Sequence, residues 1–236
     1  MKQIKIIFNS LELFLLFFAF IFPSFITNST NILYINTKPN IYHILLRIVI
    51  ILYLAIRLYD TGVFHKKKHK LTSSKVNNFI FSSIKIVLWL QTTAIICNMA
   101  LTIIPHNQVK LIAEPPNTLL TWVYFFVTLI ILAIFEEILY RGYFPERILH
   151  SVRNYSWFRK LQKKQKLIIK IGIELSIIII FALGHGYMGL KSIIVSFFCG
   201  IILRIMVKLK RSLVQVSCAH IINNIISYMI LFFVTN

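Results

Sequence analysis

Several apolar runs, each close to twenty residues long, constrain this 236-residue chain more than any other feature. A helix that crosses a bilayer needs about 20 mostly apolar residues, because each residue adds about 1.5 Å along the helix axis. The sequence has no internal repeat and no strand-like alternation. It predicts an all-α, polytopic transmembrane helical bundle of about seven spans, over residues 6–26, 41–59, 79–104, 118–144, 168–187, 192–207 and 213–234.

The whole chain has 26 Lys and Arg residues and only 7 Asp and Glu residues, and most of the basic residues lie between these runs. In a soluble protein, a formal charge of +19 would suggest nucleic acid as a partner. Here the charge fits the rule that basic loops stay in the cytoplasm, which predicts a cytoplasmic amino terminus and an outer carboxyl terminus. Residues 146–170 suit an amphipathic segment on the inner membrane surface. We therefore expect anionic lipids of the inner leaflet as partners, and no nucleic acid.

Two adjacent carboxylates, Glu136 and Glu137, interrupt the apolar run that begins at Leu119. Placing an acidic side chain at the centre of a membrane helix costs about 2.5–3.5 kcal/mol of insertion free energy. This pair of carboxylates therefore indicates a functional site. On an α-helix Glu137 and Arg141 lie about 40° apart, whereas Glu136 and Arg141 diverge by about 140°. Arg141 can then neutralise Glu137 and leave Glu136 free to face another group. The alternative is an ion-pair cluster that only locks helices together.

Two later runs carry further polar residues at helical spacing. Phe181 and His185 are four residues apart, as are His220 and Asn224, so each pair shares a helix face. Counted along the helix axes, Glu136, His185 and Asn224 lie about 15 to 16 Å from the inner surface, and His220 about 10 Å. The sequence therefore predicts that these side chains meet within the bilayer.

These residue types allow two schemes for hydrolysing a peptide bond. In one, Glu136 is the general base for a water molecule that His185 orients, while His220 and Asn224 donate hydrogen bonds to the oxyanion. In the other, Glu136, His185 and His220 bind zinc, which lowers the pKa of its bound water. The spacing of the residues does not choose between the two schemes.

At these positions the chain resembles the CAAX-processing and bacteriocin-processing (CPBP) proteases, also called the Abi family, which are related to type II CAAX prenyl endopeptidases. Its Glu-Glu-x-x-x-Arg motif is matched by Glu136, Glu137 and Arg141. The motif Phe-x-x-x-His is matched by Phe181 and His185, and His-x-x-x-Asn by His220 and Asn224. The three motifs occur in the family's order, each on its own apolar run.

The resemblance implies a multi-pass intramembrane endopeptidase of the bacterial cell membrane that acts on a peptide or protein. Catalytic residues would be Glu136, Glu137, Arg141, His185, His220 and Asn224, with zinc as the cofactor only if a metal is used. Residues 119–236 would form the catalytic domain, and residues 1–118 an amino-terminal part of about three spans with a basic cytoplasmic loop. The implied role is maturation of bacteriocins or other peptides, or self-immunity. The rival hypotheses are a non-catalytic immunity or scaffold protein and a small transporter.

Overall fold

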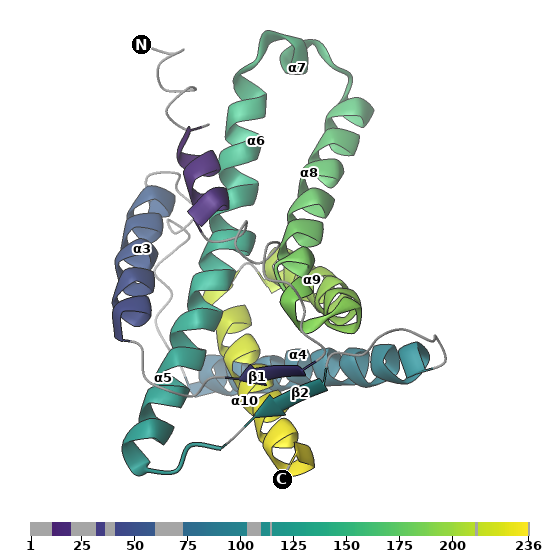
Figure 1. The fold of residues 1–236 in the computed structure, drawn as a ribbon. Helices are drawn as coiled ribbons and strands as arrows, with labels where there is room; N and C mark the ends of the chain where they lie inside the picture. The colour runs from purple at the N-terminus through teal and green to yellow at the C-terminus, as the bar shows by residue number, and fades with distance from the viewer. Residues whose placement is uncertain are drawn as a thin grey trace.

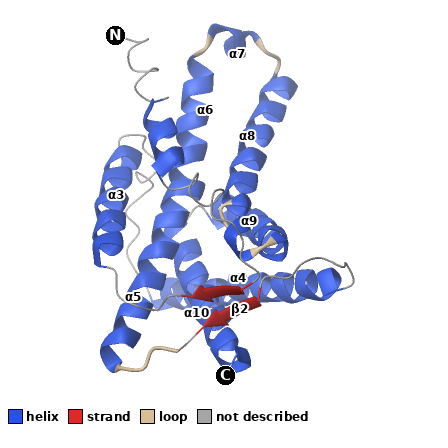
Figure 2. Ribbon diagram, viewed as in Figure 1, coloured by secondary structure: helices blue, strands red, loops and turns tan. Residues whose placement is uncertain are grey.

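The computed structural model describes residues 11–19, 32–35, 41–59, 73–102, 110–113, 115–210 and 212–235. Within them the chain forms a helical bundle, as the sequence predicts (Figures 1 and 2). A helical segment over residues 11–19 is followed by α3 (Ile41–Tyr59) and α4 (Ser73–Thr102). The remaining helices are α5 (Leu119–Glu136), η1 (Glu137–Tyr143), α6 (Phe144–Asn154), α7 (Ser156–Lys160), α8 (Lys163–Leu183), η2 (Gly186–Met188), α9 (Leu190–Lys210) and α10 (Leu213–Thr235).

Five helices in the described part of the chain are long and apolar enough to cross a membrane. They cover Ile41–Tyr59, Val76–Thr102, Leu119–Asn154, Leu190–Leu209 and Leu213–Val234. The predicted count of seven is not confirmed. Most of the predicted first span lies outside the described residues, and α8 is too charged to qualify because its first half carries four Lys residues and a Glu.

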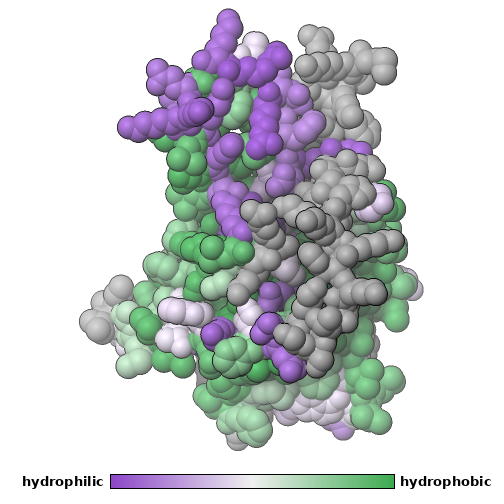
Figure 3. All heavy atoms as spheres, turned by 180° about the vertical axis from the view of Figure 1, so that it is seen from behind, coloured by the Kyte–Doolittle hydropathy of each residue, from purple (hydrophilic) through white to green (hydrophobic). Residues whose placement is uncertain are grey.

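Helices α5, η1 and α6 run on from one another as a single rod, and α8 returns beside α6 after the turn at α7 (Figure 1). Residues 146–170, expected as a surface segment, thus form the closed end of a helical hairpin. Hydrophilic side chains gather at this end (Figure 3), where exposed basic residues are Arg153, Arg159, Lys160, Lys163 and Lys164. Phe158, in contrast, is buried.

Two short strands join loops that the sequence analysis left without structure. Strand β1 (Ile32–Ile35) pairs in parallel with β2 (Lys110–Ala113), with Ile32 opposite Lys110 (Figure 2). The strands come from different connections, one before α3 and one after α4. Their pairing agrees with a topology that places both connections on one side of the membrane.

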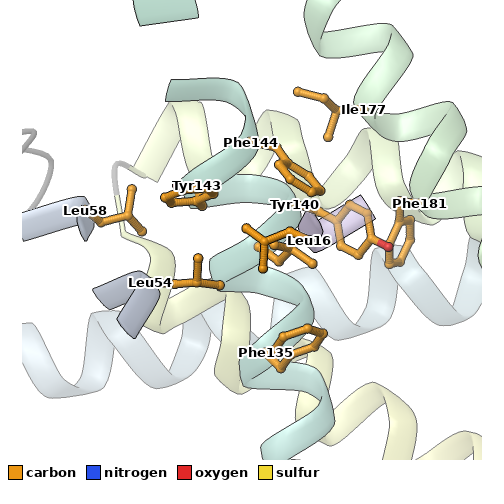
Figure 4. Close-up of a cluster of buried hydrophobic side chains, with 10 residues drawn as sticks. Leu16, Leu54, Leu58, Phe135, Tyr140, Tyr143, Phe144, Ile177 and Phe181 are labelled. Carbon is orange, nitrogen blue, oxygen red and sulfur yellow. The ribbon is translucent and has the colours of Figure 1, made fainter. Parts of the chain in front are cut away.

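A core of ten buried residues surrounds the middle of the rod (Figure 4). Tyr143 and Leu139 of η1 are fully buried, and Leu54 and Leu58 of α3 pack beside them. Helix α4 lies against α9 and α10 in a second core. Since α3 and α4 pack directly on the carboxyl-terminal half, they form part of the scaffold of the carboxylate motif. The division at residue 118 stays a prediction.

The rod changes from α-helix to π-helix directly after Glu136. In an α-helix the carbonyl of Arg141 would accept from the residue at position 145, but Pro145 has no N–H group and its ring crowds that carbonyl. The N–H of Phe144 accordingly bonds to Leu139 O, five residues back. A single π-turn inside an α-helix is frequent at functional sites.

Arg204 of α9 supplies the donor that the proline lacks. Its Nη1 donates to the carbonyl oxygen of Arg141 at 2.6 Å. The same guanidinium forms a two-point ion pair with Glu174 of α8, and Lys208 contacts that carboxylate at 3.1 Å. Arg204 thus joins α8, α9 and the π-turn through one buried side chain.

The buried carboxylate of Glu12 attaches the first described helix to this assembly. It accepts hydrogen bonds from Tyr53 at 2.5 Å and from Arg57 Nη2 at 2.9 Å. Nη2 of Arg147, on α6, lies 3.9 Å from Oε2 of the same carboxylate. Glu12 therefore binds residues 11–19 to both α3 and the rod.

Replacing Arg204 tests its role at the π-turn. We expect Arg204→Met to lower the free energy of unfolding by about 3 kcal/mol, because it leaves the Arg141 carbonyl without this donor and the Glu174 carboxylate with the exposed Lys208 in place of a two-point ion pair. The measurement is thermal unfolding of the purified protein in detergent. Lys208→Met removes an exposed partner of the same carboxylate and should cost less than about 1 kcal/mol. Equal losses in both variants would contradict this role.

Candidate active site

A cavity of about 300 Å³ lies where α4, α5, α8, α9 and α10 meet. The predicted residues Glu136, His185, His220 and Asn224 all line it. The rest of the wall is mostly apolar or aromatic, with a few small polar groups: Leu90, Leu132, Phe181, Tyr187, Met188, Val195, Ser196, Cys199, Leu203, Asn223, Ser227, Tyr228 and Leu231. One carboxylate, two imidazoles and an amide thus converge on one mostly apolar pocket, which is the usual form of a ligand site.

Glu137 lies behind the cavity wall and is fully buried. Its Oε1 is 2.8 Å from Nδ1 of His220, and its Oε2 is 3.5 Å from Nε of Arg141. The predicted contact with Arg141 is present, but Arg141 is not the sole partner, because His220 contacts the other carboxylate oxygen. A buried charge needs such partners, since an isolated carboxylate in an apolar interior is very costly.

Glu136, unlike Glu137, lines the cavity. Its Oε2 is 3.8 Å from Nε2 of His220, so His220 lies between the two adjacent carboxylates. Glu137 therefore fixes the orientation of the His220 ring, and the ring presents its second nitrogen to Glu136. This ring contact with both carboxylates was not predicted.

The second motif lies where α8 ends. Nδ1 of His185 is 3.0 Å from the carbonyl oxygen of Phe181, one of the last carbonyls of the helix, which lack partners within it. A carbonyl can only accept, so Nδ1 carries the proton and Nε2 is the acceptor in the neutral ring. The Phe181 ring contacts His185 at 4.8 Å on one side and the Arg141 guanidinium at 3.8 Å on another. Phe181 thus links the first and second motifs.

The donor residues of the cavity were compared with the grouping that a metal site needs. Among the residues that the structure describes, no three His, Cys, Asp or Glu side chains are grouped closely enough to bind one. In particular, Glu136, His185 and His220 line the same cavity without forming such a group. The zinc ligand set of Glu136, His185 and His220 therefore stays a prediction.

Sequence reasoning missed two sets of residues around the site. Glu174 and Arg204 were given no role, although Pro145, four residues after Arg141, signals a carbonyl that needs an outside donor. Gln91 of α4 was given no role, yet its Nε2 is 3.0 Å from Oδ1 of Asn223 on the cavity wall. A lone amide in an apolar run was the only sequence signal of this contact.

Comparison with known families gives one match, to the model described as type II CAAX prenyl endopeptidase Rce1-like, over residues 118–226. Comparison with curated proteins and with solved structures gives none. The matched region contains all three motifs and every cavity residue except Leu90, Ser227, Tyr228 and Leu231. Together with the apolar helices, it supports an integral membrane protease of the CAAX type, which acts on a peptide or protein. Residues 118–226 are thus similar to the Rce1-like type II CAAX prenyl endopeptidases, in agreement with the resemblance drawn from the motifs.

Proposed function

We propose that this protein is an intramembrane endopeptidase in which Glu136 activates water to attack a peptide bond. The observation that carries the proposal is the arrangement of Glu136, His185, His220 and Asn224 around one cavity, with Glu137 holding His220 from behind. General bases and oxyanion donors must lie within hydrogen-bond reach of the same reacting atoms. Four such groups around one cavity suit this requirement.

The attacking water is held between Glu136 and His185. Glu136 accepts one proton of the water as its oxygen bonds to the substrate's carbonyl carbon. Nε2 of His185 accepts a hydrogen bond from the second proton, since Nδ1 is committed to the Phe181 carbonyl. Glu136 then returns its proton to the amide nitrogen as the C–N bond breaks. The products are a carboxyl group and an amine.

The oxyanion is stabilised by His220 and Asn224. When Nε2 of His220 donates a hydrogen bond to the oxyanion, the ring is positively charged because Nδ1 already donates to Glu137. The buried Glu137 carboxylate offsets this charge without contacting the substrate. Glu137 and Arg141 are therefore positioning residues in this scheme, and Glu136, His185, His220 and Asn224 are catalytic.

The physiological substrate that we propose is a peptide precursor, as in the bacteriocin-processing proteins whose motifs this chain resembles, with processing or self-immunity as the outcome. The rival role is immunity through binding alone. An experiment in cells distinguishes the two roles, because Glu136→Gln abolishes protection against the peptide only if protection requires cleavage.

The basic end of the hairpin, around Lys160, Lys163 and Lys164, supports the proposed cytoplasmic side of the molecule. Exposed Lys and Arg side chains near anionic headgroups contribute about 1 kcal/mol each. With exposed Trp157 beside them, they suit contact with the inner leaflet. We propose the same side for the amino terminus, which the rule on basic loops predicts to be cytoplasmic.

Removing the general base tests the reaction. We expect Glu136→Gln to lower kcat at least 10²-fold, because an amide cannot accept the proton of water. The assay uses purified protein in detergent and quenched peptides that end in Cys-a-a-Met, with and without a farnesyl group, beside peptides that lack this ending. Glu146→Gln is the matched control, because Glu146 lies on the same rod but does not line the cavity. Full activity in folded Glu136→Gln protein would refute the mechanism.

Metal removal tests the choice between the two schemes. We expect activity to persist after dialysis against EDTA or 1,10-phenanthroline, because the cavity donors are not grouped as a metal site. The measurement is kcat before and after dialysis, with the metal content determined by mass spectrometry. Loss of activity that zinc restores would replace the glutamate scheme with the metal scheme.

A further inference from the structure

The cavity wall on α10 carries a second amide, Asn223, directly before Asn224. Positions 220, 223, 224 and 227 follow the spacing of one helix face, and all four side chains line the cavity. Asn223 lies about 4.5 Å from His220 along the helix axis, whereas an extended peptide advances about 3.3 Å per residue. Its side chain can therefore contact a substrate group about one residue from the peptide bond that is cleaved beside His220.

Gln91 of α4 holds this amide in one orientation. Nε2 of Gln91 is 3.3 Å from the backbone carbonyl oxygen of Asn223, 3.0 Å from Asn223 Oδ1 and 3.3 Å from Ser227 Oγ. A backbone carbonyl only accepts hydrogen bonds, so the Gln91 atom facing it must be the amide nitrogen. The Asn223 atom that faces the same nitrogen must then be its oxygen.

This fixed orientation leaves the amide nitrogen of Asn223 as a donor. Nδ2 has no hydrogen-bond partner among the residues that the structure describes, while Asn223 itself lines the cavity. Gln91 does not line the cavity and acts from behind its wall. We propose that Gln91 orients Asn223 so that its Nδ2 donates a hydrogen bond to a backbone carbonyl of the substrate, about one residue from the cleaved bond.

This inference rests on the proposed endopeptidase activity and adds a substrate contact outside the three motifs. A hydrogen bond to a carbonyl that does not react is present in both the bound substrate and the transition state. Its loss therefore raises KM and leaves kcat unchanged. Loss of an oxyanion donor would lower kcat instead.

The test compares KM and kcat of purified variants in detergent, with the best-cleaved quenched peptide of the panel described above. We expect Asn223→Ala to raise KM about two- to tenfold, the range for one neutral hydrogen bond, with kcat within about twofold of wild type. Gln91→Met should give a similar rise, and the double variant should be no worse than Asn223→Ala, because both changes remove one contact. Gln91→Leu serves if Gln91→Met does not fold.

Gln91→Glu tests the orientation of the Asn223 amide by replacing the donor at position 91 with an acceptor. A carboxylate only accepts hydrogen bonds, so the Asn223 amide must turn its nitrogen toward it and present oxygen to the substrate carbonyl. We expect a larger rise in KM than for Gln91→Met. A rise equal to or below that of Gln91→Met would overturn the assigned orientation.

The matched control is Gln215→Leu. Gln215 also joins α10 to α4, through a 3.2 Å bond from Nε2 to the carbonyl of Phe79, but it does not line the cavity. Unchanged KM in this variant shows that a loosened α4–α10 contact does not cause the effect, and a rise equal to that of Gln91→Met overturns the proposal. Wild-type KM in Asn223→Ala, with cleavage still abolished by Glu136→Gln, overturns this inference alone. Absence of cleavage by the wild type overturns it together with the proposed function.

Discussion

The buried carboxylate of Glu137 is the constraint on which the rest of the site depends. Because no water reaches it, its charge must be met by fixed partners, and these are Arg141 on its own helix and His220 on α10. Satisfying this one charge fixes the rotation of the rod, the position of α10 and the orientation of the imidazole. Glu136, the next residue, is thereby directed into the cavity. Burial of the Glu137 carboxylate costs free energy, and the same arrangement positions the Glu136 carboxylate in the cavity.

The sequence was sufficient for the helical class, the three motifs and their convergence. Apolar runs of membrane length and four-residue spacing are local signals, and the cavity contains Glu136, His185, His220 and Asn224 as predicted. The π-turn was not predicted, because the α-helical angle assumed between Glu137 and Arg141 ignored the proline that follows. The predicted count of seven spans was also not confirmed. One reason is that α8 combines a charged first half with an apolar second half.

Contacts between distant segments were beyond sequence reasoning. The pairs Gln91 with Asn223 and Glu174 with Arg204 join residues 132 and 30 positions apart, and no local pattern relates them. A charged residue near the end of an apolar run is equally compatible with an anchor at the membrane interface and with one partner of a buried ion pair. Only the packing of α8 against α9, and of α4 against α10, decides between these interpretations.

The Glu12 cluster also bears on how the chain enters the membrane. Glu12 and Arg57 lie on the first two apolar runs, which leave the ribosome well before Arg147 is synthesised. During that interval Arg57 is already available to neutralise Glu12, which favours insertion of the first two apolar runs as a pair. Arg147 then meets a partner that is already in place. The order of synthesis would thus assemble the support of the catalytic rod before the rod itself.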